Sequence, residues 1–387
     1  MSWPVVALGD LVDIRGGGTP SKQKPEYWGG AVPWASVKDF RGAELNETTD
    51  YITTLGVEKS ATNIIPAGNI IVPTRMALGK VAINTVDMAI NQDLKALIVR
   101  NEKVLDKNYL KRFLEAKADF IEGHGKGATV KGITLDVLRK LEVPVPPIRE
   151  QKRIATILDK ADAIRRKRQQ AIQLADEFLR SVFLDMFGDP VINPKGWEVK
   201  PLKQLARVTT GSTPSRKEER FYGDHIEWIK SDNINTPCHF LTKASESLSV
   251  EGKKVARVVG SGSILVTCIA GSFDCIGNVA YADREVAFNQ QINALTPFNG
   301  VRSWFLYALI IFSKKHIQSA STNSMKGMVS KGKMEEIPMI CPPLSIQDEF
   351  QEVFLKFLSL TDRLDRSFAG ATDVFDSLSQ QAFSGEI

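Results

Sequence analysis

The chain has few residues of the kinds that carry metal or redox chemistry. Among its 387 residues are only four cysteines and four histidines. The cysteines (Cys238, Cys268, Cys275 and Cys341) all lie in the second half and form no CxxC pair, and only Cys238 and His239 are adjacent. A zinc site needs ligands at short, regular spacing, so we expect neither a zinc site nor a disulfide framework. Reduced cysteines of this kind are typical of a cytoplasmic protein.

Long apolar runs are also missing. The most apolar stretch, WFLYALIIF at residues 304–312, is well short of the roughly 20 residues that span a membrane. Asp10 and Asp13 interrupt the N-terminal region, so no export signal is visible. We therefore expect a cytoplasmic protein with no membrane partner.

Catalytic signatures are absent as well. The sequence contains no GxxxxGK[ST] loop for ATP, no (N/D/S)PP(Y/F) amino-methyltransferase motif and no FxGxG cofactor loop. The segment GHGKGATVKG at 123–132 lacks the phosphate-loop spacing, and Asp189 with Glu198 and Lys200 matches a nuclease pattern only loosely. We therefore expect a chain that is non-catalytic by itself. Two alternatives stay open: a single-chain nuclease or methyltransferase, and a helical adaptor that binds DNA without sequence preference.

What the chain does contain is an internal duplication. WPVVALGDLVDIRGGGTPS at 3–21 returns as WEVKPLKQLARVTTGSTPS at 197–215, AINQDLKALIV at 89–99 as AFNQQINALTP at 287–297, and VPPIREQ at 145–151 as CPPLSIQ at 341–347. The offset between the copies stays between 194 and 198 residues. Two copies of one folding unit predict a protein that acts twice, or on a bipartite target.

Each copy is predicted to have two parts, which makes the fold class α+β. The first part, residues 1–147 or 197–343, is a mixed α/β domain with short strands such as 69–75 and 263–270 and helical patches at 108–121 and 303–312. The second part is a long helix, over 148–187 or 344–387, that begins after a Pro-Pro pair. Residues 188–196, rich in Pro, Gly and Asn, are the predicted linker.

Both predicted helices carry apolar residues at three- and four-residue spacing, which is typical of an amphipathic or coiled-coil helix. The first holds nine basic and six acidic residues, whereas residues 346–387 hold three basic and eight acidic ones. These opposite charges favour pairing of the two helices with each other; the alternative is a helix packed on its own domain. Gly370 is a possible kink in the second helix. The predicted residues of the helix and subunit interface are Ile154, Leu158, Ile164, Phe178, Phe350, Phe357, Leu364 and Leu378.

The duplicated motifs, in this order, resemble the specificity (S) subunit of type I restriction-modification systems, the HsdS family. The strongest resemblance lies in VPPIREQKRIATILDKADAIRRKRQQ at 145–170 followed by LDMFGDPVINPKGW at 184–197. The two WxxxxL…GxTPS segments resemble the start of each target recognition domain of that family. The resemblance runs along the whole chain.

This resemblance implies a scaffold rather than a catalyst. Two target recognition domains would be held apart by two antiparallel helices with pseudo-twofold symmetry, and each domain would read one half of a split, asymmetric site in double-stranded DNA. The helices would measure the spacer and dock two methyltransferase (M) subunits, to which endonuclease/translocase (R) subunits are added. AdoMet, ATP and Mg²⁺ would belong to those partner subunits.

For contacts to DNA we look for Lys and Arg near phosphates and for Arg, Asn and Ser near base edges. Such residues lie in the loops after each TPS motif, after the tryptophan strands, after residues 69–75, and in the Gly/Lys loops before the helices. The candidates are Lys22, Lys24, Ser36, Lys38, Arg75, Lys80, Lys126 and Lys131 in the first copy, and Arg216, Lys217, Arg220, Lys230, Ser231, Asn233, Lys326 and Lys331 in the second.

Each of these groups also has a structural interpretation. A solvated basic surface without function has the same composition, and Trp34 and Trp228 fit a hydrophobic core. The amides of 91–93 and 289–291 suit either adenine or a shared turn. The run from Arg165 to Arg168 covers a full helical turn, so it faces DNA phosphates, a partner, the second helix or solvent.

Overall fold

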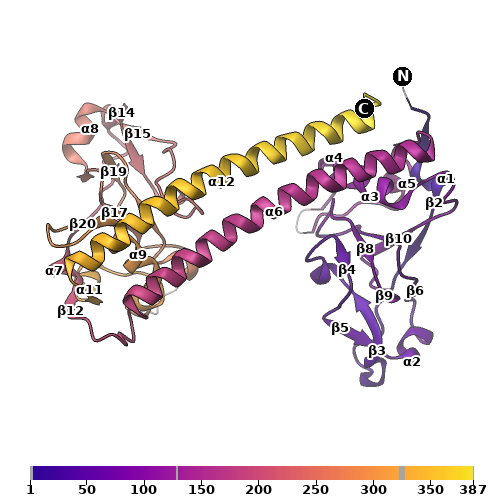
Figure 1. The fold of residues 1–387 in the computed structure, drawn as a ribbon, viewed down its shortest axis with the longest axis horizontal. Coiled ribbons are helices and arrows are strands. Elements are labelled where there is room, and N and C mark those ends of the chain that lie inside the picture. The colour runs from indigo at the N-terminus through magenta and orange to yellow at the C-terminus, as the bar shows by residue number, and fades with distance from the viewer. Residues whose placement is uncertain (1–2, 128–129, 322–326, 387) are drawn as a thin grey trace. The chain divides into compact units, whose positions relative to one another are not determined.

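The computed structural model describes residues 3–127, 130–321 and 327–386. The chain divides into two compact units, residues 1–170 with 366–387 (unit 1) and residues 171–365 (unit 2). Each unit contains one globular part and a portion of both long helices, α6 (Ile148–Phe187) and α12 (Leu344–Ser384) (Figure 1). Within the described residues, no helix is long and apolar enough to cross a membrane.

The globular part of unit 1 contains three sheets. The largest has the order β2 (Val12–Gly16), β10 (Leu94–Val99), β7 (Ile70–Pro73), β8 (Ala82–Asn84), β4 (Glu44–Leu45). The second has the order β5 (Asp50–Ile52), β3 (Trp28–Ala35), β9 (Met88–Ile90), β6 (Ile64–Ile65), and the third pairs β1 (Val5–Ala7) with β11 (Glu142–Pro144). Its helices are α1 (Leu8–Leu11), α2 (Thr54–Glu58), α3 (Lys107–Ala116), α4 (Ala118–Gly123) and α5 (Leu135–Arg139), with 3₁₀ turns η1 (Pro25–Tyr27) and η2 (Val37–Asp39).

The globular part of unit 2 repeats this plan. Its sheets have the orders β13 (Ala206–Thr210), β20 (Ile292–Pro297), β17 (Ile264–Thr267), β18 (Val279–Tyr281); β15 (Ser247–Leu248), β14 (Tyr222–Ile229), β19 (Val286–Phe288), β16 (Val258–Val259); and β12 (Val199–Pro201) with β21 (Pro338–Ile340). Its helices are α7 (Leu202–Leu205), α8 (Val250–Val255), α9 (Ser303–Phe312), α10 (Lys314–Ser319) and α11 (Lys331–Glu335), with 3₁₀ turns η3 (Glu219–Phe221), η4 (Ser231–Asn233) and η5 (Phe273–Cys275).

The pairing registers show that the two globular parts are copies of one fold. In unit 1, β3 pairs with β9 in parallel, with Trp34 opposite Ala89. In unit 2, β14 pairs with β19 in parallel, with Trp228 opposite Ala287. Both β3 and β14 also carry a register shift against the antiparallel neighbour, β5 or β15. Shared irregularities of this kind identify equivalent positions, and the predicted mixed α/β duplication is confirmed.

The repeated Pro-Pro motif fastens each long helix to its globular part through a glutamine. Gln151 is fully buried, its Nε2 donates to the carbonyl oxygens of Val104 and Pro146 at 2.8 Å, and its Oε1 accepts from the N–H of Asp106 at 2.8 Å. In unit 2, Gln347 donates to Pro342 at 2.8 Å and accepts from the N–H of Arg302 at 2.9 Å. The motif is therefore a structural bracket that satisfies backbone groups at the start of each helix.

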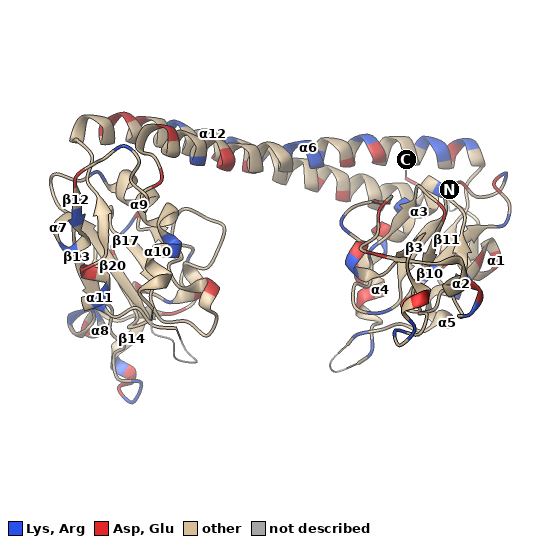
Figure 2. Cartoon of the chain, turned by 90° about the horizontal axis from the view of Figure 1, so that it is seen from below, with Lys and Arg blue, Asp and Glu red and all other residues tan. Residues whose placement is uncertain are grey.

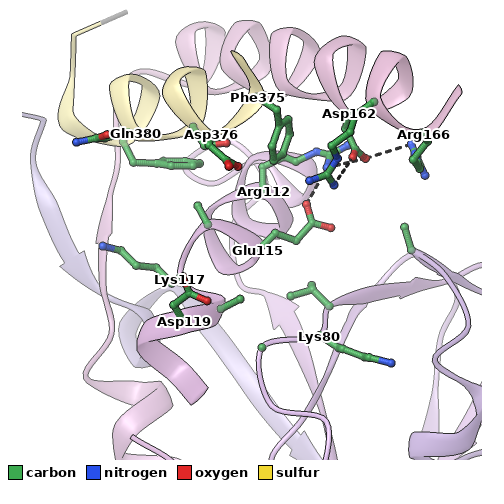
Figure 3. A pocket seen from close by; sticks show the side chains of 18 of the residues that line it. Lys80, Arg112, Glu115, Lys117, Asp119, Asp162, Arg166, Phe375, Asp376 and Gln380 are labelled. Atoms are coloured by element: carbon green, nitrogen blue, oxygen red, sulfur yellow. Dashed lines mark hydrogen bonds and ion pairs between the residues drawn. The ribbon is translucent and has the colours of Figure 1, made fainter. Parts of the chain in front are cut away.

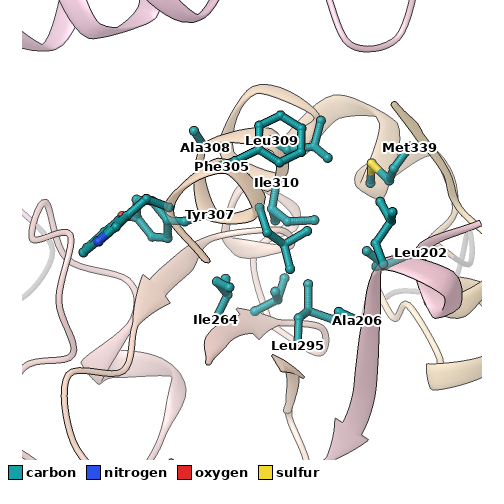
Figure 4. Packing of buried hydrophobic residues seen from close by; sticks show 14 of the residues in the cluster. Leu202, Ala206, Ile264, Leu295, Phe305, Tyr307, Ala308, Leu309, Ile310 and Met339 are labelled. Carbon is teal, nitrogen blue, oxygen red and sulfur yellow. The ribbon is translucent and has the colours of Figure 1, made fainter. Parts of the chain in front are cut away.

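The long helices supply part of each hydrophobic core. In unit 1, Ile154 and Leu158 of α6 and Ala382 of α12 lie in the cluster formed by α3 and the large sheet. In unit 2, Phe183 and Phe350 lie in the cluster formed around α9, which packs on β18, β17 and β20. Figure 4 shows α9 residues such as Phe305 and Leu309 above Ile264 and Leu295 of the sheet. Each long helix therefore packs on a globular part, and the two helices also contact each other. In unit 1, for example, the Arg168 guanidinium donates to the carbonyl oxygen of Ser367.

Two residues of the predicted helix and subunit interface are not covered by the second helix. Ile164 is 51% exposed and Phe178 is 59% exposed. A long helix with apolar residues on more than one face leaves the choice of seam open, and the less exposed positions of α6 include Arg165 and Arg168 instead. The other predicted residues, Ile154, Leu158, Phe350, Phe357, Leu364 and Leu378, are buried or half-buried. Helix α12 continues through Gly370 without interruption.

Candidate nucleic-acid interface

The strand that carries the repeated tryptophan ends in the same capped turn in both units. After β3, the N–H of Ser36 donates to Asp39 Oδ2 at 2.7 Å, and after β14 the N–H of Lys230 donates to Asn233 Oδ1 at 3.0 Å. The Ser36 hydroxyl is buried and donates to Asp39, and Asn233 is buried with its amide on Thr242 and Lys243. These two candidates therefore serve the turn and are withdrawn as DNA contacts.

The tryptophans on these strands belong to the hydrophobic core, which is the structural alternative that the sequence offered for them. Trp34 and Trp228 are 5% and 3% exposed. Their Nε1 atoms donate to backbone carbonyl oxygens of the preceding GxTPS loops, of Gly18 at 2.9 Å and Ser212 at 3.2 Å. Each tryptophan therefore fixes the loop that presents the basic residues after the TPS motif.

In unit 2 this loop and strand exit form a charged cluster. Arg216 Nη2 lies 2.7 Å from Glu246 Oε2, and the Lys230 ammonium binds the other oxygen of the same carboxylate. The Arg216 guanidinium also lies 4.6 Å from the centre of the Tyr222 ring and 5.1 Å from that of Trp228. Lys230 and Arg216 hold the pKa of Glu246 below its usual range. One carboxylate thus orders two cations, while Ser231 is half-buried and Lys217 and Arg220 are exposed.

The corresponding loop of unit 1 has less internal pairing. Lys22 and Lys38 are exposed and have no ionic partner among the residues that the structure describes. Lys24 Nζ donates to the Tyr27 hydroxyl at 3.2 Å and lies 5.2 Å from the ring centre. The same loop therefore presents free lysines in one unit and a paired arginine and lysine in the other.

A second group of predicted residues meets at the end of β7. The N–H of Met76 donates to the carbonyl oxygen of Lys131 at 3.0 Å, and Arg75 forms a β-bridge with Gly132. Lys126 and Gly132 exchange both backbone hydrogen bonds at 2.9 Å. The structure thus brings Arg75 together with Lys126 and Lys131 from a much later segment of the chain, and all three are exposed.

Unit 2 has the same backbone arrangement with different side chains. Ile269 forms the equivalent β-bridge with Met328, and the N–H of Val329 donates to the carbonyl oxygen of Cys268 at 3.0 Å. Lys331 is exposed at the start of α11, with its Nζ 3.5 Å from Glu335 Oε1. The remaining candidate of this loop, Lys326, lies outside the described residues.

The repeated amides of the NQD and NQQ segments form a shared turn. Asn91 and Asn289 are buried, and each side-chain oxygen accepts from the N–H two residues later, at 3.1 Å from Asp93 and 3.0 Å from Gln291. The structural interpretation therefore holds for the asparagines. A Cβ at Gly17 would lie 1.9 Å from the carbonyl oxygen of Ile90, so only glycine fits where the loop passes this turn.

Lys80 lies apart from the other candidates, in a groove of about 1060 Å³ in unit 1 that is lined by both long helices, α3 and the loop after Phe40. The opposite wall carries Arg112, which lies between Glu115 and Asp162 (Figure 3). Arg166 also binds Asp162, at 3.3 Å. Basic and acidic groups alternate here, as they do along both long helices (Figure 2). Because acidic groups repel phosphates, this groove does not suit the DNA backbone.

The acids of the nuclease-like pattern have structural roles. Asp189 Oδ1 accepts from the N–H groups of Val191 and Ile192 at 2.8 and 3.0 Å, and Glu198 pairs with Lys200 at 2.9 Å. Within residues 3–127, 130–321 and 327–386, no group of three or more His, Cys, Asp or Glu side chains is placed to hold a metal ion. The geometry gives no support to a nuclease centre in this part of the chain.

Several residues that position these candidates are not apparent from the sequence. Glu246 orders Arg216 and Lys230, Asp93 lies beneath Arg75, and Gly132 faces it. These contacts join segments far apart in the chain, so spacing alone does not reveal them. The available signal was the comparison of the two copies, which differ at these positions.

Comparison with known proteins agrees with this architecture. The family model described as "Type I restriction modification DNA specificity domain" matches residues 1–174 and 194–366. The chain is 25% identical over 385 residues to the type I restriction enzyme MjaIX specificity subunit of Methanocaldococcus jannaschii, covering 91% of this chain and 85% of the relative. It is 38% identical over 163 residues to the EcoR124I/EcoR124II specificity subunit of Escherichia coli, covering 41% and 40%.

Solved structures show the same fold. The S subunit of the type I restriction-modification system of M. genitalium aligns with a TM-score of 0.57 at 16% identity, over 99% of this chain and 96% of that one. A chain from a study of complex assembly and conformational transition in a type I system aligns with a TM-score of 0.60 at 14% identity, over 100% and 98%.

Proposed function

This chain belongs to the type I restriction-modification DNA specificity family, and from that premise we propose that it reads a bipartite, asymmetric site in double-stranded DNA, one half with each globular part. One observation carries the proposal. The two units present loops from the same backbone frame, but the side chains at equivalent positions differ, as with Arg75 in unit 1 and Ile269 in unit 2. Equal frames with unequal side chains suit two half-sites of different sequence.

The basic residues divide into two roles under this proposal. Exposed lysines such as Lys22, Lys38 and Lys131 neutralise phosphates, which makes affinity depend on salt. Residues that a carboxylate orders, such as Arg216 and Lys230 on Glu246, have a defined orientation and suit base edges. The chain itself is non-catalytic in this proposal, and AdoMet, ATP and Mg²⁺ act on methyltransferase and endonuclease/translocase subunits.

The long helices provide the surface for those subunits and the distance between the readers. Leu174 and Phe178 of α6 and Leu360 of α12 are exposed in unit 2, and Ile164 and Val374 are exposed in unit 1. Large apolar side chains on an otherwise charged helix mark a surface for protein partners. We assign these faces to two methyltransferase subunits, and the paired helices, as an antiparallel coiled coil, to a ruler for the spacer.

The test of the reading function is methylation mapping of genomic DNA from cells with the methyltransferase, with and without this chain. We expect a single split, asymmetric motif that disappears with the chain. Replacing residues 1–147 by the same segment of a relative should change one half of that motif and leave the other half intact. A change in both halves, or methylation without the chain, would contradict the proposal.

The ruler is tested separately. To test it, seven residues are inserted into each long helix. In α6 they are placed between Gln169 and Asp176, and in α12 they are placed after Asp362, on the facing stretch of that helix. Each helix then becomes longer by about 10 Å. This is about three base pairs of B-DNA, so the spacer should grow by about that number. An unchanged spacer with intact half-sites would show that the helices do not set the spacer length, while the proposed reading of each half-site by one globular part would still stand.

The docking surface is tested by Phe178→Asp, with Glu177→Gln as the matched control because Glu177 is an exposed neighbour. Co-purification of the methyltransferase subunits should fall for the first variant and remain for the second. Retention of both subunits by Phe178→Asp would place the docking surface elsewhere.

A further inference from the structure

Unit 1 contains a buried carboxylate that its surroundings compensate only in part. Asp93 is 8% exposed, and its Oδ1 has no hydrogen-bond partner among the residues that the structure describes. Arg75 Nη1 lies 3.6 Å from this oxygen, within the range of an ion pair but beyond a hydrogen bond. The nearby Lys95 ammonium donates to the carbonyl oxygens of Gln92 and Leu94 instead. A buried acceptor without a hydrogen bond is rare and requires an explanation.

The backbone around both residues is fixed. The N–H of Asp93 donates to Asn91, and its carbonyl oxygen accepts from the N–H of Thr74 at 2.7 Å and from the Thr74 hydroxyl at 3.1 Å. On the other side of Arg75, Met76 has a φ of +69° and is held by Lys131. A non-glycine residue in this left-handed region marks a constrained position, and such positions concentrate at functional sites.

Space is also reserved for the arginine side chain. A Cβ at Gly132 would lie 3.1 Å from Arg75 Cγ, tighter than an ordinary contact, so glycine opposite the arginine lets its stem pass. The guanidinium then reaches solvent, since the side chain is 58% exposed. Arg75 thus has a fixed base and one carboxylate neighbour, and within the described part of the chain Nε and Nη2 have no partner.

The equivalent positions of unit 2 differ as a set. Ile269 replaces Arg75, Met328 replaces Gly132, and Gln291 replaces Asp93. Gln291 keeps the turn hydrogen bond to Asn289 but is neutral, and its Oε1 accepts from Asn289 Nδ2 at 3.2 Å. The frame holds without the ion pair in unit 2, so the fold does not require the charges that unit 1 buries.

We propose that Arg75 reads a guanine in the half-site bound by unit 1, and that Asp93 is the positioning residue that orients its guanidinium. This rests on the proposed reading of DNA by each unit. Arginine recognises guanine by two parallel hydrogen bonds to N7 and O6. With Nη1 on Asp93, the Nε–Nη2 edge faces the base, while Lys126 and Lys131 contact the adjacent phosphates. Unit 2, with Ile269, reads no guanine from this position.

The experiment uses the chain assembled with its methyltransferase subunits and duplexes that carry the methylated motif mapped for the wild type. Each base pair of both half-sites is replaced in turn, and competitive binding and methyl transfer are measured. Arg75→Lys keeps the charge but not the two-pronged geometry. It should lower discrimination at one G·C pair of one half-site by about 10- to 100-fold and leave affinity for unrelated DNA unchanged.

Two further variants separate orientation from charge. Asp93→Asn should reduce discrimination at the same base pair, by less than Arg75→Lys does, with unchanged affinity for other sequences. Lys131→Ala, the matched control beside Arg75, should weaken binding equally for all duplexes and lower the salt dependence. Ile269→Ala, the equivalent position of unit 2, should leave this base pair unaffected. Equal thermal unfolding of all complexes shows that the variants fold.

The outcomes are distinct. Even weakening across all duplexes by Arg75→Lys, an unchanged preference, or a relaxed base pair in the other half-site would each overturn the assignment of Arg75. A defect of Asp93→Asn that appears only in thermal unfolding would overturn the positioning role. A wild-type complex without any split motif would instead refute the proposed function itself.

Discussion

In unit 1 a buried arginine joins α3 to α6, whereas in unit 2 the equivalent position is Ala308. Arg112 Nη2 lies 2.7 Å from Asp159, and Nη1 lies 2.8 Å from Glu115 and 3.1 Å from Asp162. In unit 2, Leu358 takes the place of Asp162, and aromatic rings join α9 to α12 nearby: Trp304 stacks on Phe354 with 4.6 Å between ring centres. Both attachments contain apolar side chains, but unit 1 adds an ionic cluster at positions that are apolar in unit 2.

This difference distinguishes the contacts that the shared fold requires from the contacts that are specific to one copy. Both copies keep the glutamine bracket, the capped strand exits and the tryptophan that fixes the GxTPS loop. They differ in the groups that attach the helices and in those that we assign to DNA. Duplicated domains therefore allow the shared skeleton to be identified inside one chain, because each copy is a control for the other.

The largest effect is expected from removing residues 366–387, the part of α12 that belongs to unit 1. This deletion uncovers Tyr109 and Phe113, on which Phe383 packs with ring centres 5.5 and 5.4 Å apart, and it removes the buried Ala382. Several apolar side chains at about 1.5–3 kcal/mol each approach the whole stability of a domain. We expect unit 1 to lose protection in hydrogen exchange while unit 2 keeps it. Deleting only the residues after Ser384 is the control, and equal loss in both units would contradict this.

The next effect concerns the ionic attachment. Arg112→Ala removes the most buried of three arginines that pair with Asp162, whose side chain is 7% exposed. Because Arg165 and Arg166 remain, it should cost unit 1 about 1.5–3 kcal/mol in urea unfolding followed by hydrogen exchange. The double variant Arg112→Met with Asp162→Leu imitates the apolar pair of unit 2 and should recover most of that loss. A double variant no more stable than Arg112→Ala would show that unit 1 needs the charges themselves.

A smaller and shared effect is expected at the bracket. Gln151→Ala and Gln347→Ala each leave buried backbone groups without a partner, which costs about 1–3 kcal/mol. The loss should be larger in unit 1, because Gln151 makes three of these hydrogen bonds and Gln347 makes two. Urea midpoints of each unit measure this, with Gln169→Ala, an exposed glutamine of α6, as the control. A large effect in one unit alone would break the equivalence of the brackets.

The secondary structure and the internal duplication could be predicted from the sequence, whereas the contacts between side chains could be predicted only in part. The duplication, the strands at 69–75 and 263–270 and the long helices after each Pro-Pro pair follow from local pattern, and all are present. Ile164 and Phe178 are not covered by the second helix, because periodicity defines an apolar face without saying which partner covers it. Ser36 and Asn233 were misplaced because a polar residue after a strand suits a cap as well as a base. The Arg75–Asp93 pair depends on long-range pairing that no local pattern shows.

The smallest effect distinguishes the two attachments by pH. Burial holds the pKa of His239 below its ordinary value of about 6.5, although the carboxylates of Asp176 and Asp365 oppose this. The unfolded chain therefore binds a proton before folded unit 2 does, so unit 2 should lose stability as the pH falls below about 6.5, by at most about 1.4 kcal/mol per pH unit. In unit 1 burial opposes ionisation of Asp162, but Arg112, Arg166 and Arg165 hold its pKa below the usual range.

Unit 1 should therefore keep its stability until the pH falls below about 4, where unfolded carboxylates take up protons. Urea midpoints of both units between pH 7.5 and 5, sampled by pulsed hydrogen exchange at a common labelling pH, compare the two directly. Burial raises the pKa of Asp176, so its contribution has the opposite sign and stabilises folded unit 2 as the pH falls. His239→Phe keeps an aromatic ring beside Phe354 and Phe357 and removes the titration, so it should make unit 2 as insensitive as unit 1. If unit 2 of this variant still weakens below pH 6.5, the acid sensitivity does not come from the aromatic attachment, and the contrast between the two units is one of packing alone.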